Sequence, residues 1–373
     1  MLFKKEREAP SAAPVTKEAV MDALRQIIDP DLHRDIVSLG MIKQLEIAPV
    51  EGGSNVSFTF ELTTPACPVR DQFKSMAEKA VLALPGVASV EVTMSANVRQ
   101  SAASGGANPV QIPGVRNVIA VGSGKGGVGK STIAVNLATA LAASGASVGL
   151  LDADVYGPSV PSLMGVQDGI RAQDQRLIPN VAHGVKLMSL GFMNTQGRPV
   201  IWRGPMVGQA VKQMLHDVEW GALDYLLVDL PPGTGDASLT LIQSIPLSGI
   251  VVVTTPQDIA LGIATKALAM FRQLHVPVLG IVENMSFFTC PNCGHESHIF
   301  SHGGGQSAAH ELKVPFLGDV PLDESIRESG DDGVPVLARN PGSDQARAFD
   351  TMARKLAAQV SIQTSRAIPL VVR

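Results

Sequence analysis

VIAVGSGKGGVGKST, residues 118–132, is the stretch that decides the fold. Its first four residues are a short, continuous apolar run, as in a strand that is buried on both faces. Gly124–Ser131 then fits the pattern G-x-x-x-x-G-K-[ST], and an Ala-rich helix is expected from about Lys130 to Ala143. A glycine-rich turn between a buried strand and a helix points backbone N–H groups at phosphate oxygens. The stretch therefore predicts a phosphate-binding loop.

The residue types in this loop divide its chemistry between them. The Lys130 ammonium is expected to reach the β- and γ-phosphates, and the Ser131 hydroxyl is expected to ligate Mg²⁺. The residues predicted to bind the nucleotide are Gly124, Lys125, Gly126, Gly127, Val128, Gly129, Lys130, Ser131 and Thr132.

Similar apolar runs recur after the loop, with helical patterns between several of them. They lie at 147–151, 225–228, 249–253 and 278–282. Strands that alternate with helices favour a parallel sheet covered by helices on both faces. The predicted fold class is therefore α/β, a doubly wound and mostly parallel sheet of the P-loop NTPase kind.

Carboxylates follow two of these runs, at the sheet edge where open α/β sheets bind ligands. Asp152 and Asp154 follow the run at 147–151, and Asp229 follows the run at 225–228. Asp229 is predicted to hold Mg²⁺, through water, as in a Walker B strand. Asp154 is a candidate for orienting the attacking water; the alternative is an Asp that caps the turn before Gly157.

The first 100 residues follow a different pattern and predict a small α+β domain. Expected there are a helix from Thr16 to about Asp29, a strand at 56–62, a helix at 69–84 and a strand at 87–92. The predicted organisation is a flexible tail (1–15), the small domain (16–100), a Gly/Pro-rich linker (101–113), the large domain (114–360) and a C-terminal tail (361–373).

Composition limits the function classes. The chain has 373 residues, 45% of them hydrophobic, and a formal net charge of −4, so a well-buried core is expected and no general affinity for nucleic acid or anionic lipid is indicated. No apolar run is long enough for a membrane span, and no apolar stretch of a secretory signal follows the first ten residues. With three cysteines, the sequence predicts a cytoplasmic protein without a disulfide framework.

Two of these cysteines, Cys290 and Cys293, form a C-x-x-C knuckle. Two thiolates cannot complete a metal site alone, and three completions are open. His295 and His298 would give a Cys₂His₂ zinc site. The pair could instead act as a dithiol redox couple. Two more thiolates from a second subunit would allow one [4Fe–4S] cluster across a two-fold axis.

The motifs taken together resemble a known family. GSGKGGVGKST (122–132), DADVYGPS (152–159), RGPM (203–206), DLPPGTGD (229–236) and FTCPNCG (288–294) are similar to segments of the Mrp/ApbC/Nbp iron–sulfur cluster carrier ATPases, within the MinD/ParA group. The resemblance covers about residues 115–358. The first 100 residues, with TTPACP at 63–68, resemble the small domain of iron–sulfur assembly factors.

The resemblance implies specific roles. Lys125 would reach the nucleotide of a neighbouring subunit, which implies an ATP-dependent homodimer. Asp154 would orient the attacking water and Asn284 would contact adenine, although a loop Asn without this role is the alternative. Cys290 and Cys293 would hold a bridging [4Fe–4S] cluster, now the favoured completion. Slow ATP hydrolysis and cluster delivery to apo-proteins and assembly partners are also implied.

Some alternatives stay open at this point. Cys67 lies between a predicted strand and a predicted helix, and it could bind iron transiently or simply pack at the helix start. A positioning ATPase of the MinD/ParA type and a zinc-binding, nucleotide-dependent scaffold are the rival functions.

Overall fold

The computed structural model describes residues 15–101, 111–155, 157–193, 204–233 and 235–367. The chain divides into two compact units, Met1–Asn97 and Val98–Arg373. Parts of several predicted segments lie outside the described residues: most of the N-terminal tail, most of the linker, the end of the C-terminal tail, and Tyr156, Arg203 and Thr234 of the family motifs.

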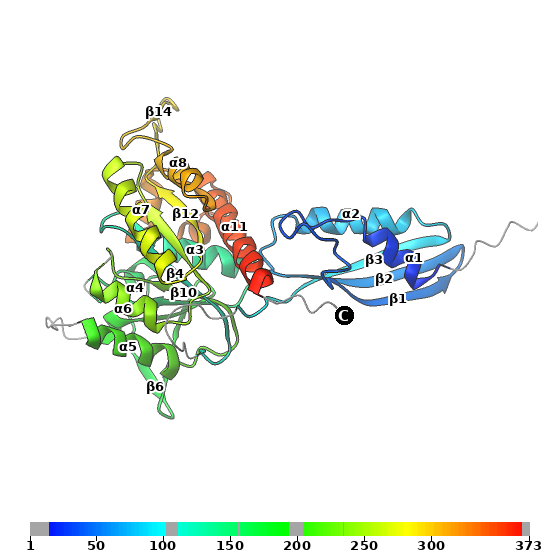
Figure 1. The fold of residues 1–373 in the computed structure, drawn as a ribbon, viewed down its shortest axis with the longest axis horizontal. Coiled ribbons are helices and arrows are strands. Elements are labelled where there is room, and N and C mark those ends of the chain that lie inside the picture. The colour runs from blue at the N-terminus through cyan, green and yellow to red at the C-terminus, as the bar shows by residue number, and fades with distance from the viewer. Residues whose placement is uncertain (1–14, 102–110, 156, 194–203, 234, 368–373) are drawn as a thin grey trace, which may run out of the picture. The chain divides into compact units, whose positions relative to one another are not determined.

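The larger unit is built on an eight-stranded sheet in the order β15-β12-β11-β4-β10-β5-β9-β8 (Figure 1). The strands are β4 (Val115–Ser123), β5 (Val148–Asp152), β8 (Asn180–Ala182), β9 (Val185–Ser189), β10 (Leu223–Asp229), β11 (Gly249–Thr254), β12 (Val278–Asn284) and β15 (Phe316–Val320). All pairings are parallel except that of β8 with β9. Every residue of β5 and β11 is buried, which accounts for their continuous apolar sequences.

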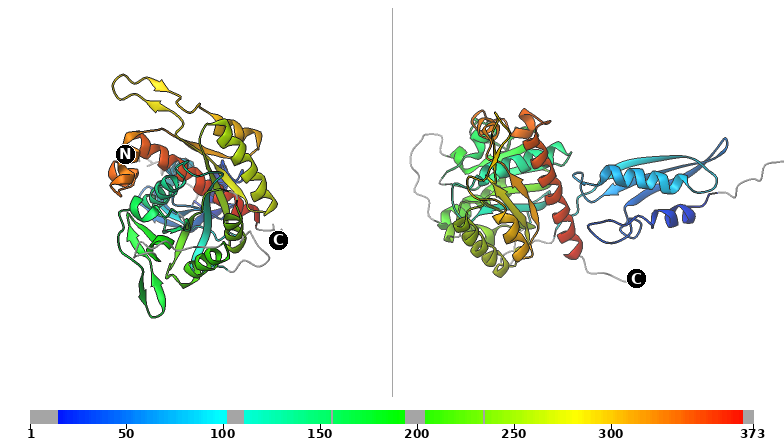
Figure 2. Two further views of the ribbon diagram at one scale, coloured as in Figure 1. Left: turned by 90° about the vertical axis from the view of Figure 1, so that its left-hand side faces the viewer. Right: turned by 90° about the horizontal axis from the view of Figure 1, so that it is seen from above.

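Helices cover both faces of this sheet, as the two views of Figure 2 show. On one face, α3 (Lys130–Ala143) packs against α11 (Asp344–Ala367), and α5 (Gly204–Asp217) packs against α6 (Asp236–Ser244) elsewhere on the sheet. The other helices are α4 (Val160–Leu163), α7 (Asp258–Gln273), α8 (Gly304–Glu311), α9 (Glu324–Asp331) and α10 (Val336–Arg339). The predicted doubly wound α/β class is confirmed.

Between β5 and α5 the chain forms elements that the sequence patterns did not predict. Besides β8 and β9 these are a hairpin of β6 (Arg171–Gln173) and β7 (Arg176–Ile178), and a 3₁₀ helix at Leu190–Met193. Strands of three residues are too short to display a hydrophobic period, so the sequence carries no signal for them.

The N-terminal unit contains a three-stranded sheet, β1-β2-β3, with two helices. Its elements are α1 (Lys17–Leu24), β1 (Ile42–Val50), β2 (Gly53–Leu62), α2 (Arg70–Leu82) and β3 (Val87–Ala96). The β2 and β3 strands are parallel and α2 connects them, and the rings of Phe60 and Phe73 stack at 5.4 Å between the sheet and this helix. The two predicted strands and the second helix are present, and β1 was not predicted.

The first helix differs in length from the prediction. Thr16 caps it as expected, because its hydroxyl accepts the Ala19 N–H at 3.2 Å. The helix ends at Leu24 rather than near Asp29. Residues 28 and 35 form an antiparallel bridge there, and the Asp29 carboxylate accepts two backbone N–H groups of the turn that follows. These competing bonds end the helix before its apolar period ends.

Two predicted boundaries can be compared with the described residues. Helix α11 continues to Ala367, so residues 361–367 of the predicted C-terminal tail are helical. Thr364 in this segment is buried. At the linker, Ser101 Oγ donates to Asn117 Oδ1 at 2.5 Å, and Ile112 is buried. Among the described helices, none has the length and hydropathy that crossing a bilayer requires.

Candidate nucleotide site and cysteine hairpin

The predicted phosphate loop joins the end of β4 to the start of α3. Gly127 and Gly129 both have left-handed backbone angles, with φ of 77° and 79°. At Gly129 a side chain would also collide with the amide nitrogen of Asn284. The glycines therefore let the chain turn and bring the first N–H groups of α3 toward the loop, where an anion binds favourably.

Lys130, Ser131 and Asp229 meet at the start of α3. Lys130 Nζ lies 2.6 Å from Asp229 Oδ1, and Ser131 Oγ donates to Asp229 Oδ2 at 2.5 Å. The Asp229 side chain is fully buried, and burial raises its pKa while the Lys130 ammonium opposes that effect. The structure thus brings together the predicted phosphate-binding lysine and both predicted Mg²⁺ ligands.

Asp152 and Asp154 lie beside this group. Asp152 accepts the Asp154 N–H at 3.1 Å and the Ser189 hydroxyl at 3.0 Å, and burial together with the nearby Asp229 charge raises its pKa to about 7. Asp154 Oδ2 lies 3.9 Å from Lys130 Nζ, and Asp154 lines the cavity over the loop. Asp152 is therefore a buried residue that holds the backbone of Asp154 in place, while Asp154 borders the space where a nucleotide would lie.

Two predicted binding residues have partners within their own chain. Lys125 Nζ donates to Gln257 Oε1 at 3.0 Å. Asn284 Nδ2 donates to the Val128 carbonyl at 2.9 Å, and Asn284 is buried. In this arrangement Asn284 supports the phosphate loop, and its contact with adenine stays a prediction, as does the reach of Lys125 to a second subunit.

The residues at this edge fit a magnesium nucleotide. A cavity of about 270 Å³ lies over the loop and is lined by Lys125, Lys130, Ser131 and Asp154. A Cβ added to Gly127 would touch nothing within 4 Å, so the loop backbone is open to an approaching phosphate. An ammonium group binds phosphate favourably, and hydroxyl and carboxylate oxygens are ligands that Mg²⁺ prefers.

The two knuckle cysteines lie on a short hairpin after β12. Its strands are β13 (Phe288–Thr289) and β14 (Glu296–Ser297), and the Cys290 N–H donates to the His295 carbonyl at 2.9 Å. Cys293 is exposed and Cys290 is partly exposed. The backbone N–H of Asn292 is the main cause that lowers the pKa of Cys290. The hairpin therefore presents one thiol whose ionised form is favoured relative to that of an ordinary cysteine.

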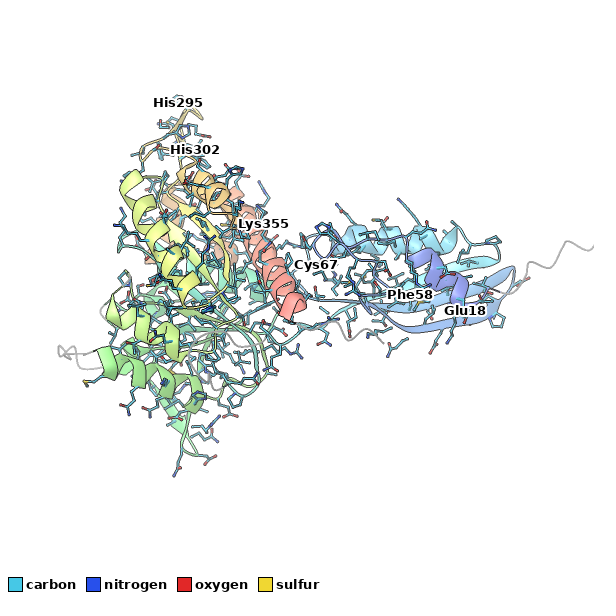
Figure 3. All side chains as sticks on the ribbon, in the orientation of Figure 1. Glu18, Phe58, Cys67, His295, His302 and Lys355 are labelled. Atoms are coloured by element: carbon cyan, nitrogen blue, oxygen red, sulfur yellow. The ribbon has the colours of Figure 1, made fainter. Side chains whose placement is uncertain are left out.

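The histidines near the knuckle are placed differently from one another. Figure 3 shows His295 at the outer end of the hairpin and His302 nearer the sheet. The His298 ring stacks on His302 at 4.6 Å, and its Nε2 lies 3.7 Å from Glu296 Oε1. Across the described part of the chain, no three His, Cys, Asp or Glu side chains are arranged to hold one metal ion.

Cys67, the third cysteine, belongs to the N-terminal unit (Figure 3). It is 9% exposed and packs in the hydrophobic core of that unit. This packing agrees with the alternative that Cys67 simply packs at the helix start. A role of Cys67 in iron binding stays a prediction.

Three residues of the site were missed at the sequence level. Gln257 holds Lys125, and the buried pair Glu283 and Ser286 lies at the end of β12 and in the turn after it, on either side of Asn284 in the sequence. Glu283 had a visible signal, because it follows an apolar strand as Asp152 and Asp229 do.

Comparison with known proteins agrees with this geometry. The family model described as "NUBPL iron-transfer P-loop NTPase" matches residues 114–357. The chain belongs to this family. A second model, "Iron-sulfur cluster assembly protein", matches residues 17–93. The loop, the Walker B carboxylate and the parallel sheet are thus those of a P-loop NTPase of the iron-transfer family, with an assembly-type domain before it.

Relatives extend over most of the chain. An iron–sulfur cluster carrier protein of Synechocystis is 49% identical over 354 residues, which is 93% of this chain and 99% of the relative. The mouse iron–sulfur cluster transfer protein NUBPL is 54% identical over 241 residues, 64% of this chain and 76% of its own. A nucleotide-binding protein from Archaeoglobus fulgidus, solved with ADP, has 38% identity and a TM-score of 0.56, and covers 64% of this chain and 93% of its own.

Proposed function

We propose that this chain hydrolyses ATP slowly, binds a [4Fe–4S] cluster across a homodimer and transfers the cluster to apo-proteins. One observation carries the proposal. A single folded unit holds a buried phosphate-site cluster of Lys130, Ser131 and Asp229 and also presents the exposed thiol pair Cys290 and Cys293. The names of the relatives, cluster carrier and cluster transfer proteins, support the same reading.

The residues of the loop would divide the work on the nucleotide. Lys130 offsets phosphate charge, Ser131 and Asp229 hold Mg²⁺, and Asp154 orients the attacking water. Mg²⁺, when bound, supplies further charge neutralisation at the phosphates. In the dimer, Lys125 would exchange Gln257 for the nucleotide of the partner subunit.

The cluster is cargo, and the hairpin supplies its ligands. Each chain offers two thiolates, and a [4Fe–4S] cluster takes four, so two chains related by a two-fold axis match the need. The lowered pKa of Cys290 favours the thiolate that binds iron. Apo iron–sulfur proteins and assembly factors are the expected partners, and a reducing cytoplasm suits exposed thiols.

Anaerobic reconstitution with iron and sulfide tests the proposal. The expected product carries four irons and four sulfides per two chains, absorbs as a [4Fe–4S] protein and has the particle mass of a dimer. Cys290→Ala and Cys293→Ala should each lose the cluster and keep nucleotide binding. Cys67→Ala, which alters the core of the other unit, is the matched control and should keep it.

Two results would overturn the proposal. Iron-loaded protein that is monomeric, or one zinc per chain in anaerobically purified protein, excludes the bridging cluster. Transfer to an apo-acceptor should also differ with and without ATP, and equal rates would remove the ATP-dependent step.

A further inference from the structure

The end of β12 contacts both the phosphate loop and the segment that follows the cysteine hairpin. Glu283 and Asn284 are consecutive residues at the end of this strand, so their side chains leave opposite faces of the sheet. Asn284 holds the Val128 carbonyl of the phosphate loop at 2.9 Å. Glu283 is 0% exposed and reaches the start of α8 on the other side. One strand end therefore contacts the loop that opens α3 and the segment that closes the cysteine hairpin.

The Glu283 carboxylate fixes that closing segment. Its Oε1 accepts the Gly303 N–H at 3.1 Å, and its Oε2 accepts the Gly305 N–H at 2.5 Å. A Cβ at Gly305 would lie 3.0 Å from Glu283 Oε2, so the close approach needs glycine. A buried carboxylate at the N-terminus of α8 is stabilised by these N–H groups and by the helix dipole.

Ser286 extends the connection to a histidine at the root of the hairpin. Its hydroxyl donates to Glu283 Oε1 at 2.5 Å and lies 2.9 Å from His302 Nδ1. A hydroxyl has one proton, so when Ser286 donates to Glu283, a His302 tautomer with its proton on Nδ1 completes the contact with Ser286. The His302 ring then stacks on His298 at 4.6 Å, beyond the second strand of the hairpin.

This order of groups excludes a nucleophile. Ser286 is 0% exposed, and it lies between the acid and the histidine rather than at the end of the chain of bonds. The Ser286 hydroxyl directs its proton to the Glu283 carboxylate. The network is suited to hold geometry.

We propose that Glu283 and Ser286 are positioning residues that connect the phosphate loop, through Asn284, to the root of the cysteine hairpin. Nucleotide binding on the loop then alters the order of the hairpin. The inference deepens the proposed function and rests on it. It supplies a route by which the nucleotide bound at the loop would affect the thiols of Cys290 and Cys293.

Hydrogen exchange in cluster-free full-length protein tests the connection. The non-hydrolysable analogue AMPPNP with Mg²⁺ should change the exchange rate of amides in 288–300 by about fivefold or more, the lower end of usual coupling between two sites. In Ser286→Ala and Glu283→Gln, the ratio of the exchange rate with AMPPNP to the rate without it should be close to one, while AMPPNP still binds. Ser307→Ala is the matched control, because Ser307 lies on α8, whose first turn Glu283 contacts, and its hydroxyl donates to the Gly303 carbonyl at 2.9 Å.

The ratio separates coupling from simple loosening. A variant that only loosens the hairpin speeds exchange with and without AMPPNP and keeps the ratio. Two results overturn the inference. One is a ratio of one in the wild-type protein, and the other is a ratio in Ser286→Ala that equals the wild-type ratio. Because no cluster is present, neither result bears on whether the protein binds one; if Ser286→Ala fails to fold, Glu283→Gln and the wild-type ratio still decide.

Discussion

Lys130 and Asp229 form an ion pair 2.6 Å long at the centre of the nucleotide site, with 6% and 0% of their side chains exposed. Each residue compensates the charge of the other in a largely buried position. Under the proposed function the pair would contribute to stability as well as to the binding of phosphate and Mg²⁺, and the two contributions can be separated by substitution.

Replacing Lys130 with Ala should abolish ATP hydrolysis and leave the fold intact. The ammonium that would offset phosphate charge is lost, while the loop backbone keeps its shape. Steady-state phosphate release measures the effect, and circular dichroism checks the fold. Unchanged hydrolysis would refute the assignment of the loop.

The same substitution should lower stability by about 3–5 kcal/mol in nucleotide-free protein, because it leaves the buried Asp229 carboxylate without its counter-ion. The double variant Lys130→Ala/Asp229→Asn should lose less than the sum of the two single variants. Urea unfolding of the four proteins gives the coupling, and strict additivity would contradict the buried pair.

Asp152 should make stability depend on pH in Mg²⁺-free protein. Its folded pKa of about 7 lies above the ordinary aspartate value of 3.8, so between these values the folded state holds a proton that the unfolded state has lost. Its contribution to stability is therefore fully present below about pH 4 and is lost as pH rises to about 7. Asp152→Asn should flatten this slope, measured as melting temperature from pH 5 to 8; an unchanged slope would exclude Asp152 as its source.

Cys290 should react faster with iodoacetamide than Cys293 at neutral pH. The Asn292 N–H is the main group that lowers the Cys290 pKa, and the thiolate is the reactive form. Asn292→Pro removes that N–H and should slow Cys290, whereas Asn292→Ala keeps it and should not. Peptide mapping by mass spectrometry reads both thiols, and equal slowing by the two variants would contradict the role of the N–H.

Gly129→Ala should weaken nucleotide binding more than Gly127→Ala. Both positions have left-handed φ, which costs an Ala about 1–2 kcal/mol. Only at Gly129 does the new Cβ collide with Asn284, while at Gly127 it meets nothing within 4 Å. Calorimetric titration with ADP compares the two, and equal losses would mean that Asn284 can move away without consequence.

The sequence predicted what local patterns encode. Continuous apolar runs located the central strands, and the order of Gly, Lys and Ser between a strand and a helix located the phosphate loop. Asp229 was identified because it ends such a run, and the structure places it beside Lys130 and Ser131.

What the sequence did not reveal depends on contacts between distant segments. Gln257 meets Lys125 across 132 residues, and Asn284 meets Val128 across 156. A side chain that holds a backbone carbonyl leaves no periodic signal, so the support that Asn284 gives to the phosphate loop could not be predicted, and its contact with adenine stays a prediction. The early end of α1 at Leu24 has a local origin instead, since the bridge between residues 28 and 35 and the turn at Asp29 override its apolar period.

The cysteine hairpin has one more consequence. Its ladder joins strands of only two residues, Phe288–Thr289 and Glu296–Ser297, and residues 291–296 are all exposed. So small a ladder opens at a low free energy while the eight-stranded sheet stays closed. A protease can therefore nick the hairpin without waiting for the domain to unfold. Under the proposed function, a bound cluster would hold the hairpin closed, so the cluster-free chain would be the form more vulnerable to degradation.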